Sequence, residues 1–460
     1  MTQPVTLPLW AFILIILFAA VTFASHFLFP SVRWFFRRRA ERVVARVNAR
    51  LQRPIEPFKL ARRHDMIQRL IYDPQVAQAV ADEARADGIP EAVAFERARR
   101  YAREIVPSFS ASAYFGFGIR VSRYLSKSLY RIKLGAFDRK ALTQIDPDAT
   151  VIFVMNHRSN MDYVLVTYLA ASAGTLSYAV GEWARVWPLS GLIRAMGAYF
   201  IRRRSRGQLY RKVLARYVQM ATRGGVSQAV FPEGGLSLTG RAAEPRVGLI
   251  SYVMEDFDPA SRDVIFVPVA LNYDRILEDE FLVAAHIRGN RRFRPPLGQV
   301  LRGVARHAWR RMTGRFRDFG VASVSFGAPL TVSEWLDAGN PADPERLGRE
   351  LMDRIAAVVP VLGVPLTARA LLQAHSATKQ AVVARVAADI AYCGERRLPR
   401  PLRAAEVVVE EALADLVGRG LVLREGGKLK VPEAKRPLVA FYANSIAHHF
   451  ETPALTAAGS

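Results

Sequence analysis

The chain has 460 residues, of which 51% are hydrophobic, so it can form a sizeable core in one large domain with appendages or in two or three domains. Its 65 basic and 41 acidic side chains give a formal net charge of +24, which favours polyanions such as nucleic acid, anionic lipid headgroups or phosphorylated substrates. The single cysteine, Cys393, excludes an internal disulfide and a cysteine-rich zinc site, and it favours a reducing compartment.

The first thirty residues predict a transmembrane helix. Residues 7–24 carry no charge, and 25–29 extend this apolar run past the roughly 20 residues that a bilayer span needs. A cleaved signal peptide would have basic residues before its apolar run, and none precedes this one. Five arginines instead follow it within 33–42. By the positive-inside rule, the chain beyond the run stays in the cytoplasm. We therefore expect residues 1–30 to be an uncleaved single-pass anchor.

Residues 31–140 have the pattern of a basic helical region. Arginine alternates with valine and leucine at helical spacing over 38–52, which suits either contact with an anionic membrane leaflet or a solvated connecting helix. A second basic amphipathic stretch covers 105–134.

Between 141 and 340 the sequence alternates short apolar runs with helical stretches. Candidate strands cover 151–155, 229–231, 264–270 and 322–326, and a helical pattern covers 209–222. This alternation indicates an α/β layer fold.

From 345 to 460 the pattern is mainly helical. Residues 402–417 have helical periodicity, and the segments 421–423 and 428–431 flank a hairpin signature that contains Gly426 and Gly427. A helix followed by a hairpin resembles a winged helix.

The first candidate strand leads directly into a segment that contains His157 and Asp162. Five residues on a continuous helix separate two side chains by about 140°, so these two meet only if His157 lies in a loop and Asp162 in the next helix. Ser159 or Asn160 would cap that helix. A carboxylate on one imidazole nitrogen leaves the other nitrogen free to accept a proton, as a general base does. Taken alone, the pair is more typical of a surface histidine near a helix N-terminus.

Two further segments carry basic or flexible residues after apolar runs. Arg202, Arg203 and Arg204 are suited to binding a phosphomonoester, because guanidinium groups bind phosphate oxygens in bidentate fashion, but a solvated basic turn would have the same sequence. Residues 231–241 form a glycine-rich turn whose backbone amides could approach a ligand closely. This turn matches neither a P-loop nor a nucleophile elbow.

The run at 267–274 is a strand that leaves the core toward the same end of the sheet. Together the four segments resemble, in order, four sequence blocks of the glycerol-3-phosphate acyltransferase branch of the glycerolipid acyltransferase superfamily. The blocks correspond to residues 157–163, 197–203, 231–241 and 267–275, and residues 436–446 are similar to the family's C-terminal segment. The resemblance implies an α/β core, with a mixed sheet flanked by helices. The positive-inside rule puts this catalytic domain on the cytoplasmic side of the anchor.

The resemblance also implies a reaction and a set of site residues. His157 would be the general base and Asp162 its orienting partner in the transfer of a fatty acyl group to glycerol 3-phosphate. The donor would be acyl-CoA or acyl-carrier protein, and the reaction would need no metal, no cofactor and no covalent acyl-enzyme. Arg202 and Arg203 would hold the phosphate, and Pro268 would shape the floor near the thioester. The substrate-binding set comprises Arg158, Arg202, Arg203, Glu233, Gly234, Gly235, Arg241 and Pro268.

The third block departs from the family pattern at Leu236 and Leu238, where the family usually carries basic residues. Only Arg241 remains basic there, which leaves the phosphorylated acceptor open. The nearest enzymatic alternative is therefore acylation of 1-acylglycerol 3-phosphate, that is, lysophosphatidic acid.

A nucleic-acid-binding protein is the alternative from another class, and a purely structural membrane organiser is a third. The net charge, the helix and hairpin and the arginine-rich stretch 288–317 would suit nucleic acid. The apolar spacing within that stretch is better suited to a basic amphipathic face against lipid or acyl-carrier protein. We expect membrane lipids as partners and no nucleic acid.

Overall fold

The computed structural model describes residues 8–19, 38, 42, 44–49, 51–170, 174–181, 189–202, 207–289, 318–374 and 376–451. The chain divides into two compact units, Met1–Ile55 and Glu56–Ser460. In the first unit, residues 9–19 are helical. None of the helices in the described part of the chain combines the length and the apolar character of a membrane span. Much of the anchor predicted over 1–30, like most of the arginine-rich stretch 288–317, lies outside the described residues.

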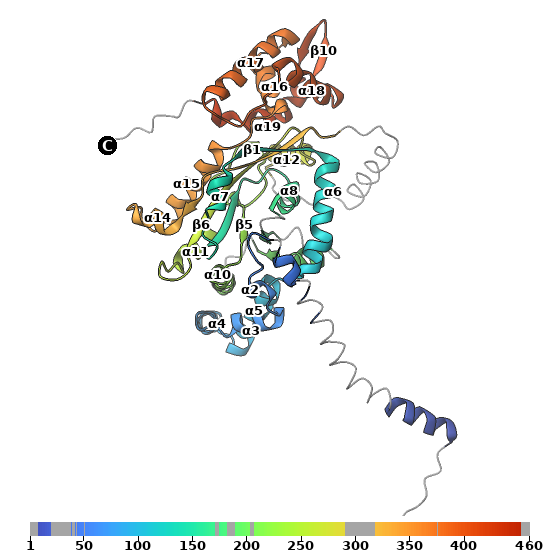
Figure 1. Cartoon of the computed structure of the whole chain (residues 1–460), viewed down its shortest axis with the longest axis vertical. Coiled ribbons are helices and arrows are strands. Elements are labelled where there is room, and N and C mark those ends of the chain that lie inside the picture. Colours follow the sequence, from blue (N-terminus) through green and yellow to red (C-terminus); the bar gives the residue numbers. More distant parts are fainter. Residues whose placement is uncertain are drawn as a thin grey trace, which may run out of the picture. The chain divides into compact units, whose positions relative to one another are not determined.

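The second unit is built on a mixed β-sheet (Figure 1). Its described strands follow the order β1-β7-β6-β2-β5-β3-β4, and β8 pairs with β6. The pairs β6–β7 and β6–β8 are antiparallel and the other pairs are parallel. The strands are β1 Arg131–Phe137, β2 Thr150–Met155, β3 Ser177–Val180, β4 Tyr199–Phe200, β5 Gln228–Val230, β6 Val264–Tyr273, β7 Val321–Phe326 and β8 Leu330–Thr331. The expected mixed sheet is confirmed.

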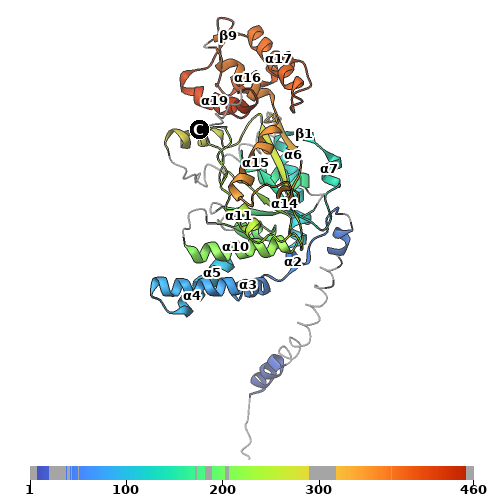
Figure 2. The same cartoon turned by 90° about the vertical axis from the view of Figure 1, so that its left-hand side faces the viewer.

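Two hydrophobic cores lie on the two faces of this sheet. Successive side chains of a strand point to opposite faces, and accordingly Val151 and Met155 of β2 belong to one core whereas Ile152 and Val154 belong to the other. The core that contains Ile152 is covered by α3 Arg63–Ile71, α4 Pro74–Asp87, α5 Glu91–Ile105, α10 Gln208–Arg223, α11 Gly248–Glu255, α14 Val332–Asp337 and α15 Pro344–Ala357. Figure 2 shows α3, α4 and α5 side by side beneath α10.

The opposite core lies between the sheet and the C-terminal helices. Its helices are α6 Ile119–Leu129, α8 Met161–Leu169, α12 Asp279–Ile287, α16 Gly363–Leu372, α17 Lys379–Glu395, α18 Ala405–Gly418 and α19 Arg436–Asn444. Short elements complete the fold: α2 Pro57–Leu60, the π-helix η1 Ser112–Gly118, α7 Arg139–Thr143, α9 Leu189–Ala195, and the 3₁₀-helices η4 Glu433–Lys435 and η5 Ala447–His449.

Local sequence signals explain where α4 begins and ends. The Asp73 side chain caps the helix by accepting a hydrogen bond from the Gln75 backbone N–H, and Pro74 occupies the first turn, where its missing N–H costs nothing. Gly88 ends the helix with a φ of 63°, a left-handed conformation that glycine adopts without steric cost. Asp73 also binds Arg216 of α10 at 2.7 Å, which ties the two helices together.

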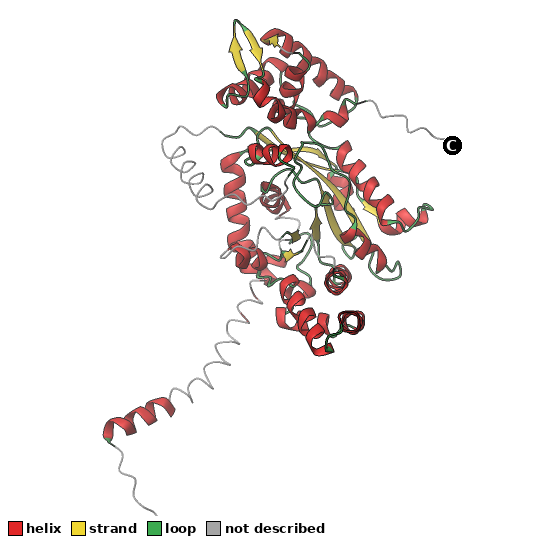
Figure 3. Cartoon of the chain, turned by 180° about the vertical axis from the view of Figure 1, so that it is seen from behind, coloured by secondary structure: helices red, strands yellow, loops and turns green. Residues whose placement is uncertain are grey.

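The C-terminal helices carry a second, three-stranded sheet (Figure 3). It is formed by β9 Ser376–Thr378, β10 Leu423–Glu425 and β11 Lys428–Lys430 in the order β10-β11-β9. The predicted hairpin and the helix before it are confirmed, although β10 begins two residues later than the apolar run at 421–423.

The strands predicted at 151–155, 229–231, 264–270 and 322–326 are confirmed as β2, β5, β6 and β7, and the helix predicted at 209–222 as α10. The amphipathic interpretation of 105–134 is wrong at its end, because residues 131–134 belong to β1. This strand is stabilised by parallel pairing with β7, about 190 residues further along the chain, and its own periodicity does not reveal that pairing.

Candidate active site

The candidate site lies at the carboxyl end of β2. His157 follows β2 and Glu233 follows β5, and because these two strands are parallel neighbours both residues emerge at the same edge of the sheet. The Glu233 carboxylate accepts a hydrogen bond from the His157 backbone N–H at 2.8 Å. The first and third sequence blocks therefore meet in the structure.

His157 and Asp162 form a buried pair. The imidazole Nδ1 lies 2.9 Å from the Asp162 Oδ2, and the side chains are 1% and 0% exposed. His157 is in the loop after β2 and Asp162 is in the first turn of α8, which confirms the predicted loop-then-helix arrangement. Of the two predicted caps, Ser159 is the one whose hydroxyl accepts a hydrogen bond, from the Met161 N–H at 3.1 Å, whereas Asn160 makes no side-chain cap.

The Asp162 carboxylate is held by three further donors. Its Oδ2 also accepts from the backbone N–H groups of Arg158 at 2.7 Å and Ser159 at 3.0 Å. Its Oδ1 accepts from the Tyr273 hydroxyl at 2.6 Å. The carboxylate is thereby fixed in orientation, and the Nδ1–H tautomer of His157, which leaves Nε2 as a base, satisfies the pair. No pattern in the sequence indicates the role of Tyr273 beyond its position at the end of a strand.

Aromatic rings fix the plane of the His157 imidazole. The Phe231 ring stacks on it with centroids 4.1 Å apart, and the Tyr163 ring meets it edge-on at 5.4 Å. The His157 carbonyl also accepts a hydrogen bond from the Ser237 N–H at 3.0 Å. The histidine is thus held through its ring, its backbone and its Nδ1.

The Glu233 carboxylate accepts hydrogen bonds from two backbone N–H groups. Besides the His157 N–H, it accepts the Ala243 N–H at 3.0 Å, and burial raises the pKa of its carboxyl despite these two hydrogen bonds. Gly234 follows with a φ of 65°, and a Cβ there would lie 2.7 Å from the Arg246 Cδ, so this turn requires glycine. Gly235 lies next to it in the same turn.

Arg158 is buried close to the pair. Its guanidinium donates a hydrogen bond to the Gly240 carbonyl, and its Nε has no partner within the described part of the chain. Burial lowers the pKa of this guanidinium. A buried cation with an unused donor is suited to an anionic ligand.

Arg202 is engaged elsewhere. Its Nε and Nη2 donate to the two Glu104 carboxylate oxygens at 2.8 and 2.6 Å, which raises the pKa of Arg202, and the guanidinium lies over the Tyr101 ring. β4, which precedes Arg202, is three strands from β2, or about 14 Å at the usual strand spacing. The structure therefore does not bring Arg202 into contact with His157. Arg203 lies outside the described residues.

The two remaining predicted residues lie at the margins of the site. Arg241 forms a half-exposed ion pair with Glu451 at 2.6 Å. Pro268 is buried in β6 opposite Val154 of β2, between the part of β6 that pairs with β8 and the part that pairs with β7. A residue without an N–H loses nothing at such a change of partners.

A cleft of about 2030 Å³ borders the end of the loop of residues 156–160 between β2 and α8, which we call the catalytic loop. Asn160 and Met161 line it, together with the start of α12 and residues of the C-terminal helices, whereas His157 does not. Within the described residues, no group of three or more His, Cys, Asp or Glu side chains could hold a metal ion.

Two family models match parts of this chain. Residues 138–272 match the family model described as Acyltransferase, and residues 309–459 match the one described as Glycerol-3-phosphate acyltransferase C-terminal region. These two matches, together with the name that the curated relatives below carry, support the glycerol-3-phosphate acyltransferase branch of the acyltransferase superfamily.

Curated relatives named glycerol-3-phosphate acyltransferase cover most of the chain. The protein from Pseudomonas putida is 28% identical over 435 residues, which are 86% of this chain and 50% of the relative. The protein from Aeromonas hydrophila is 28% identical over 431 residues, 87% of this chain and 51% of the relative. The chain thus spans about half the length of the curated relatives it matches.

Among solved structures, the crystal structure of the 1-acyl-sn-glycerophosphate (LPA) acyltransferase from Thermotoga maritima is similar over 56% of this chain and 79% of that chain. Its identity is 17% and its TM-score 0.32, a likeness too low to carry an argument about the fold.

Proposed function

We propose that this protein is a glycerol-3-phosphate 1-O-acyltransferase that transfers a fatty acyl group from acyl-CoA or acyl-carrier protein in phospholipid biosynthesis. The observation that carries the proposal is the buried His157–Asp162 pair, with Nδ1 and Oδ2 2.9 Å apart at the carboxyl end of a central strand. The names of the curated relatives support the substrate.

The proposed reaction begins with proton transfer to His157. Its Nε2 takes the proton of a glycerol hydroxyl as the oxygen attacks the thioester carbonyl, and a tetrahedral oxyanion forms. The Asp162 carboxylate stabilises the imidazolium that results. Collapse of the oxyanion breaks the carbon–sulfur bond, and the imidazolium returns the proton to the departing thiolate. The thioester is already activated, so we propose no cofactor and no acyl-enzyme.

Arg158 is the strongest candidate for binding the acceptor phosphate. It is buried beside the pair and its Nε is unused among the described residues. Arg202 would contribute after leaving Glu104, and Arg203 and Arg241 would add positive charge. Gly234 and Gly235 would let the backbone approach the acceptor, and Pro268 would underlie the thioester. We propose these roles as a set.

Leu236 and Leu238 bear on the alternative acceptor. Both are half-buried and pack against the core that contains the C-terminal helices. Because these two leucines pack against the core, they do not form a binding site for an acyl chain. They therefore do not favour lysophosphatidic acid as the acceptor. Lysophosphatidic acid nevertheless remains the second acceptor to test.

The test is a transfer assay of the purified protein with both acceptors and both donors. We expect labelled acyl groups to appear on glycerol 3-phosphate with at least one donor. Transfer to lysophosphatidic acid alone would replace the proposed acceptor, and no transfer under any of the four conditions would overturn the activity.

We also propose that residues 1–30 anchor the protein in a membrane, with the catalytic part on the cytoplasmic face and membrane lipids as partners. The uncharged run and the arginines behind it support this proposal. Alkaline carbonate should leave the full-length protein in the membrane and should strip a variant that lacks residues 1–30. If carbonate also strips the full-length protein, the anchor is wrong.

Nucleic acid is not among the proposed partners. The helix before the hairpin, α18, carries Glu406, Glu410, Glu411 and Asp415 and no basic residue. An acidic helix at this position would repel a phosphate backbone.

A further inference from the structure

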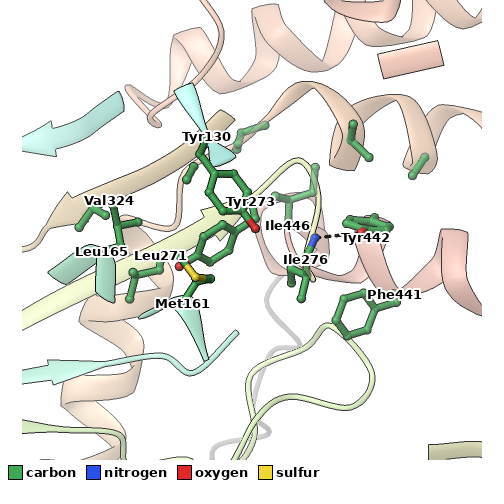
Figure 4. Close-up of a cluster of buried hydrophobic side chains, with 14 of the residues drawn as sticks. Tyr130, Met161, Leu165, Leu271, Tyr273, Ile276, Val324, Phe441, Tyr442 and Ile446 are labelled. Carbon is green, nitrogen blue, oxygen red and sulfur yellow. Dashed lines mark hydrogen bonds between the residues drawn. The ribbon is translucent and has the colours of Figure 1, made fainter. Parts of the chain in front are cut away.

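The segment of residues 273–279, from the end of β6 to the start of α12, contacts the catalytic loop on one side and the C-terminal helices on the other. We call it the post-β6 segment. It begins with Tyr273, the last residue of β6, and ends with Asp279, the first residue of α12. Figure 4 shows Tyr273 and Ile276 of this segment near Met161 of α8 and Tyr442 of α19.

On the catalytic side, both ends of the segment hold the loop. The Tyr273 hydroxyl donates to the Asp162 Oδ1 at 2.6 Å. The Glu278 carboxylate accepts the Asn160 N–H at 2.6 Å and the Ser159 hydroxyl at 3.0 Å. Ser159 and Asn160 lie between the two residues of the catalytic pair, so Glu278 restrains the piece of backbone that sets their separation.

Burial makes these contacts strong restraints. Glu278 is 7% exposed and Ser159 is 0% exposed. A hydrogen bond in the low-dielectric interior is stronger than one in water, and a buried polar group left without a partner is costly. Removal of the Glu278 carboxylate would leave the Asn160 N–H without its acceptor and would release the loop.

On the C-terminal side, Asp279 and Ile276 are held by two helices. The Asp279 Oδ2 accepts hydrogen bonds from the Arg419 guanidinium at the end of α18 and from the Tyr442 hydroxyl of α19. The Tyr442 hydroxyl in turn accepts the Ile276 N–H at 3.2 Å, the bond that Figure 4 draws. The side chains of Asp279, Arg419 and Tyr442 are largely buried, so water does not compete for these hydrogen bonds.

A third link connects the start of the segment to α16. The Asp274 carboxylate accepts the Val364 N–H at 2.9 Å and the Val321 N–H of β7 at 2.8 Å. Three C-terminal helices therefore contact a segment of seven residues whose two ends hold the catalytic loop.

We propose that Glu278 is a positioning residue for the acyl transfer and that Tyr442 and Arg419, through Asp279, hold Glu278 in place from the C-terminal helices. The inference rests on the proposed function and assigns the C-terminal region to the catalytic apparatus. A shift of about 1 Å in a catalytic group can cost up to about a hundredfold in rate, so a restraint on the loop acts on turnover more than on substrate binding.

The first test compares Glu278→Ala with Glu278→Gln in steady-state kinetics. We expect Glu278→Ala to lower kcat tenfold to a hundredfold and to leave the KM of both substrates within about twofold. Glu278→Gln retains a carbonyl acceptor for the Asn160 N–H, so it should restore most of the lost kcat. The matched control is Glu280→Ala, which removes an exposed carboxylate two residues further on, in the first turn of α12, and should leave kcat at the wild-type value.

The second test alters a residue of the C-terminal helices and measures the effect on turnover. Tyr442→Phe removes one buried hydroxyl without leaving a large cavity, and we expect it to lower kcat severalfold with unchanged KM values. Tyr392→Phe, a ring of the same region stacked on Phe450, is the control and should leave kcat unchanged. This pair also carries the test if Glu278→Ala does not fold.

The outcomes separate this inference from the proposed function. A wild-type protein without acyl transfer would overturn both. An active wild type, with folded Glu278→Ala or Tyr442→Phe proteins that keep the wild-type kcat, would overturn the inference alone. So would a Glu278→Gln protein as slow as Glu278→Ala, because hydrogen-bond positioning requires the amide to substitute.

Discussion

The Nδ1 of His157 lies 2.9 Å from the Oδ2 of Asp162, although five residues of chain separate the two side chains. A continuous helix would place them on different faces. The contact forms because β2 ends at Met155 and α8 begins at Met161, so that the intervening loop turns the histidine back over the first turn of the helix. The acyltransferase chemistry proposed for this chain depends on that loop.

The ion pair between Arg202 and Glu104 provides a test of phosphate binding. If Arg202 also binds the acceptor phosphate, the phosphate must compete with the Glu104 carboxylate. Arg202→Ala should then raise the acceptor KM about tenfold to a hundredfold, the worth of a charge-assisted bidentate contact. Glu104→Gln should lower the acceptor KM, because it releases the guanidinium from a charged competitor. The donor KM is the internal control for both variants.

The opposite result has a clear interpretation. If folded Arg202→Ala and Glu104→Gln proteins keep the wild-type acceptor KM and only unfold at lower temperature, Arg202 serves the contact between α5 and the residues after β4.

The buried carboxyl of Glu278 should make the free energy of unfolding depend on pH. Burial, with a smaller contribution from the Asp162 charge, raises the pKa of its carboxyl to about 7, against the hydrogen bonds from Asn160 and Ser159. A carboxyl in an unfolded chain has a pKa of about 4.3, so its contribution to stability is complete below that pH and is lost as the pH rises through 7. Between pH 5 and pH 8 the loss is about 2–3 kcal/mol.

Urea unfolding of wild type and Glu278→Gln at pH 5 and pH 8 measures this contribution. The difference in unfolding free energy between the two pH values should be smaller in Glu278→Gln by about 2–3 kcal/mol. Equal pH dependence in the two proteins would mean that the pKa of Glu278 is not raised.

The structure leaves no room for a side chain at Gly240. Its φ is 88°, and a Cβ there would overlap the carbonyl oxygen of Phe441 in α19. Gly240→Ala should therefore displace the loop whose carbonyl receives the Arg158 guanidinium, lowering both activity and stability, the latter by about 3 kcal/mol. Gly420, with a φ of 68° and open space around it, is the matched control.

Thermal unfolding and turnover should be measured for both variants. Gly420→Ala bears only the backbone cost of about 1–2 kcal/mol and should retain full turnover. Equal behaviour of the two variants would show that the contact between the Gly240 loop and α19 is unimportant.

Much of the fold could be predicted from sequence where the hydrophobic pattern was strong. The runs that became β2 and β6 are buried nearly throughout, and α10 has a clear amphipathic period, so each was predicted in place. In contrast, β1 alternates poorly and β4 has only two residues. Such strands are stabilised by partners distant in sequence, which a local pattern does not contain.

The same limit applies to the site. The contact of His157 with Asp162 spans five residues and follows from local geometry. The contacts of Tyr273 with Asp162 and of Glu278 with Ser159 span 111 and 119 residues, and Glu104 is 98 residues from Arg202. These partners became visible only when the sheet brought distant segments together.

The most direct test of the central claim is the turnover of His157→Ala, measured beside Asp162→Asn. A general base contributes about 10²- to 10⁴-fold, so a folded His157→Ala protein with normal donor binding should lose at least about 99% of transfer. Asp162→Asn should also be impaired, because an amide can stabilise the wrong tautomer and cannot balance the imidazolium. A folded His157→Ala protein that keeps more than about a tenth of wild-type turnover would contradict the assignment of His157 as the base.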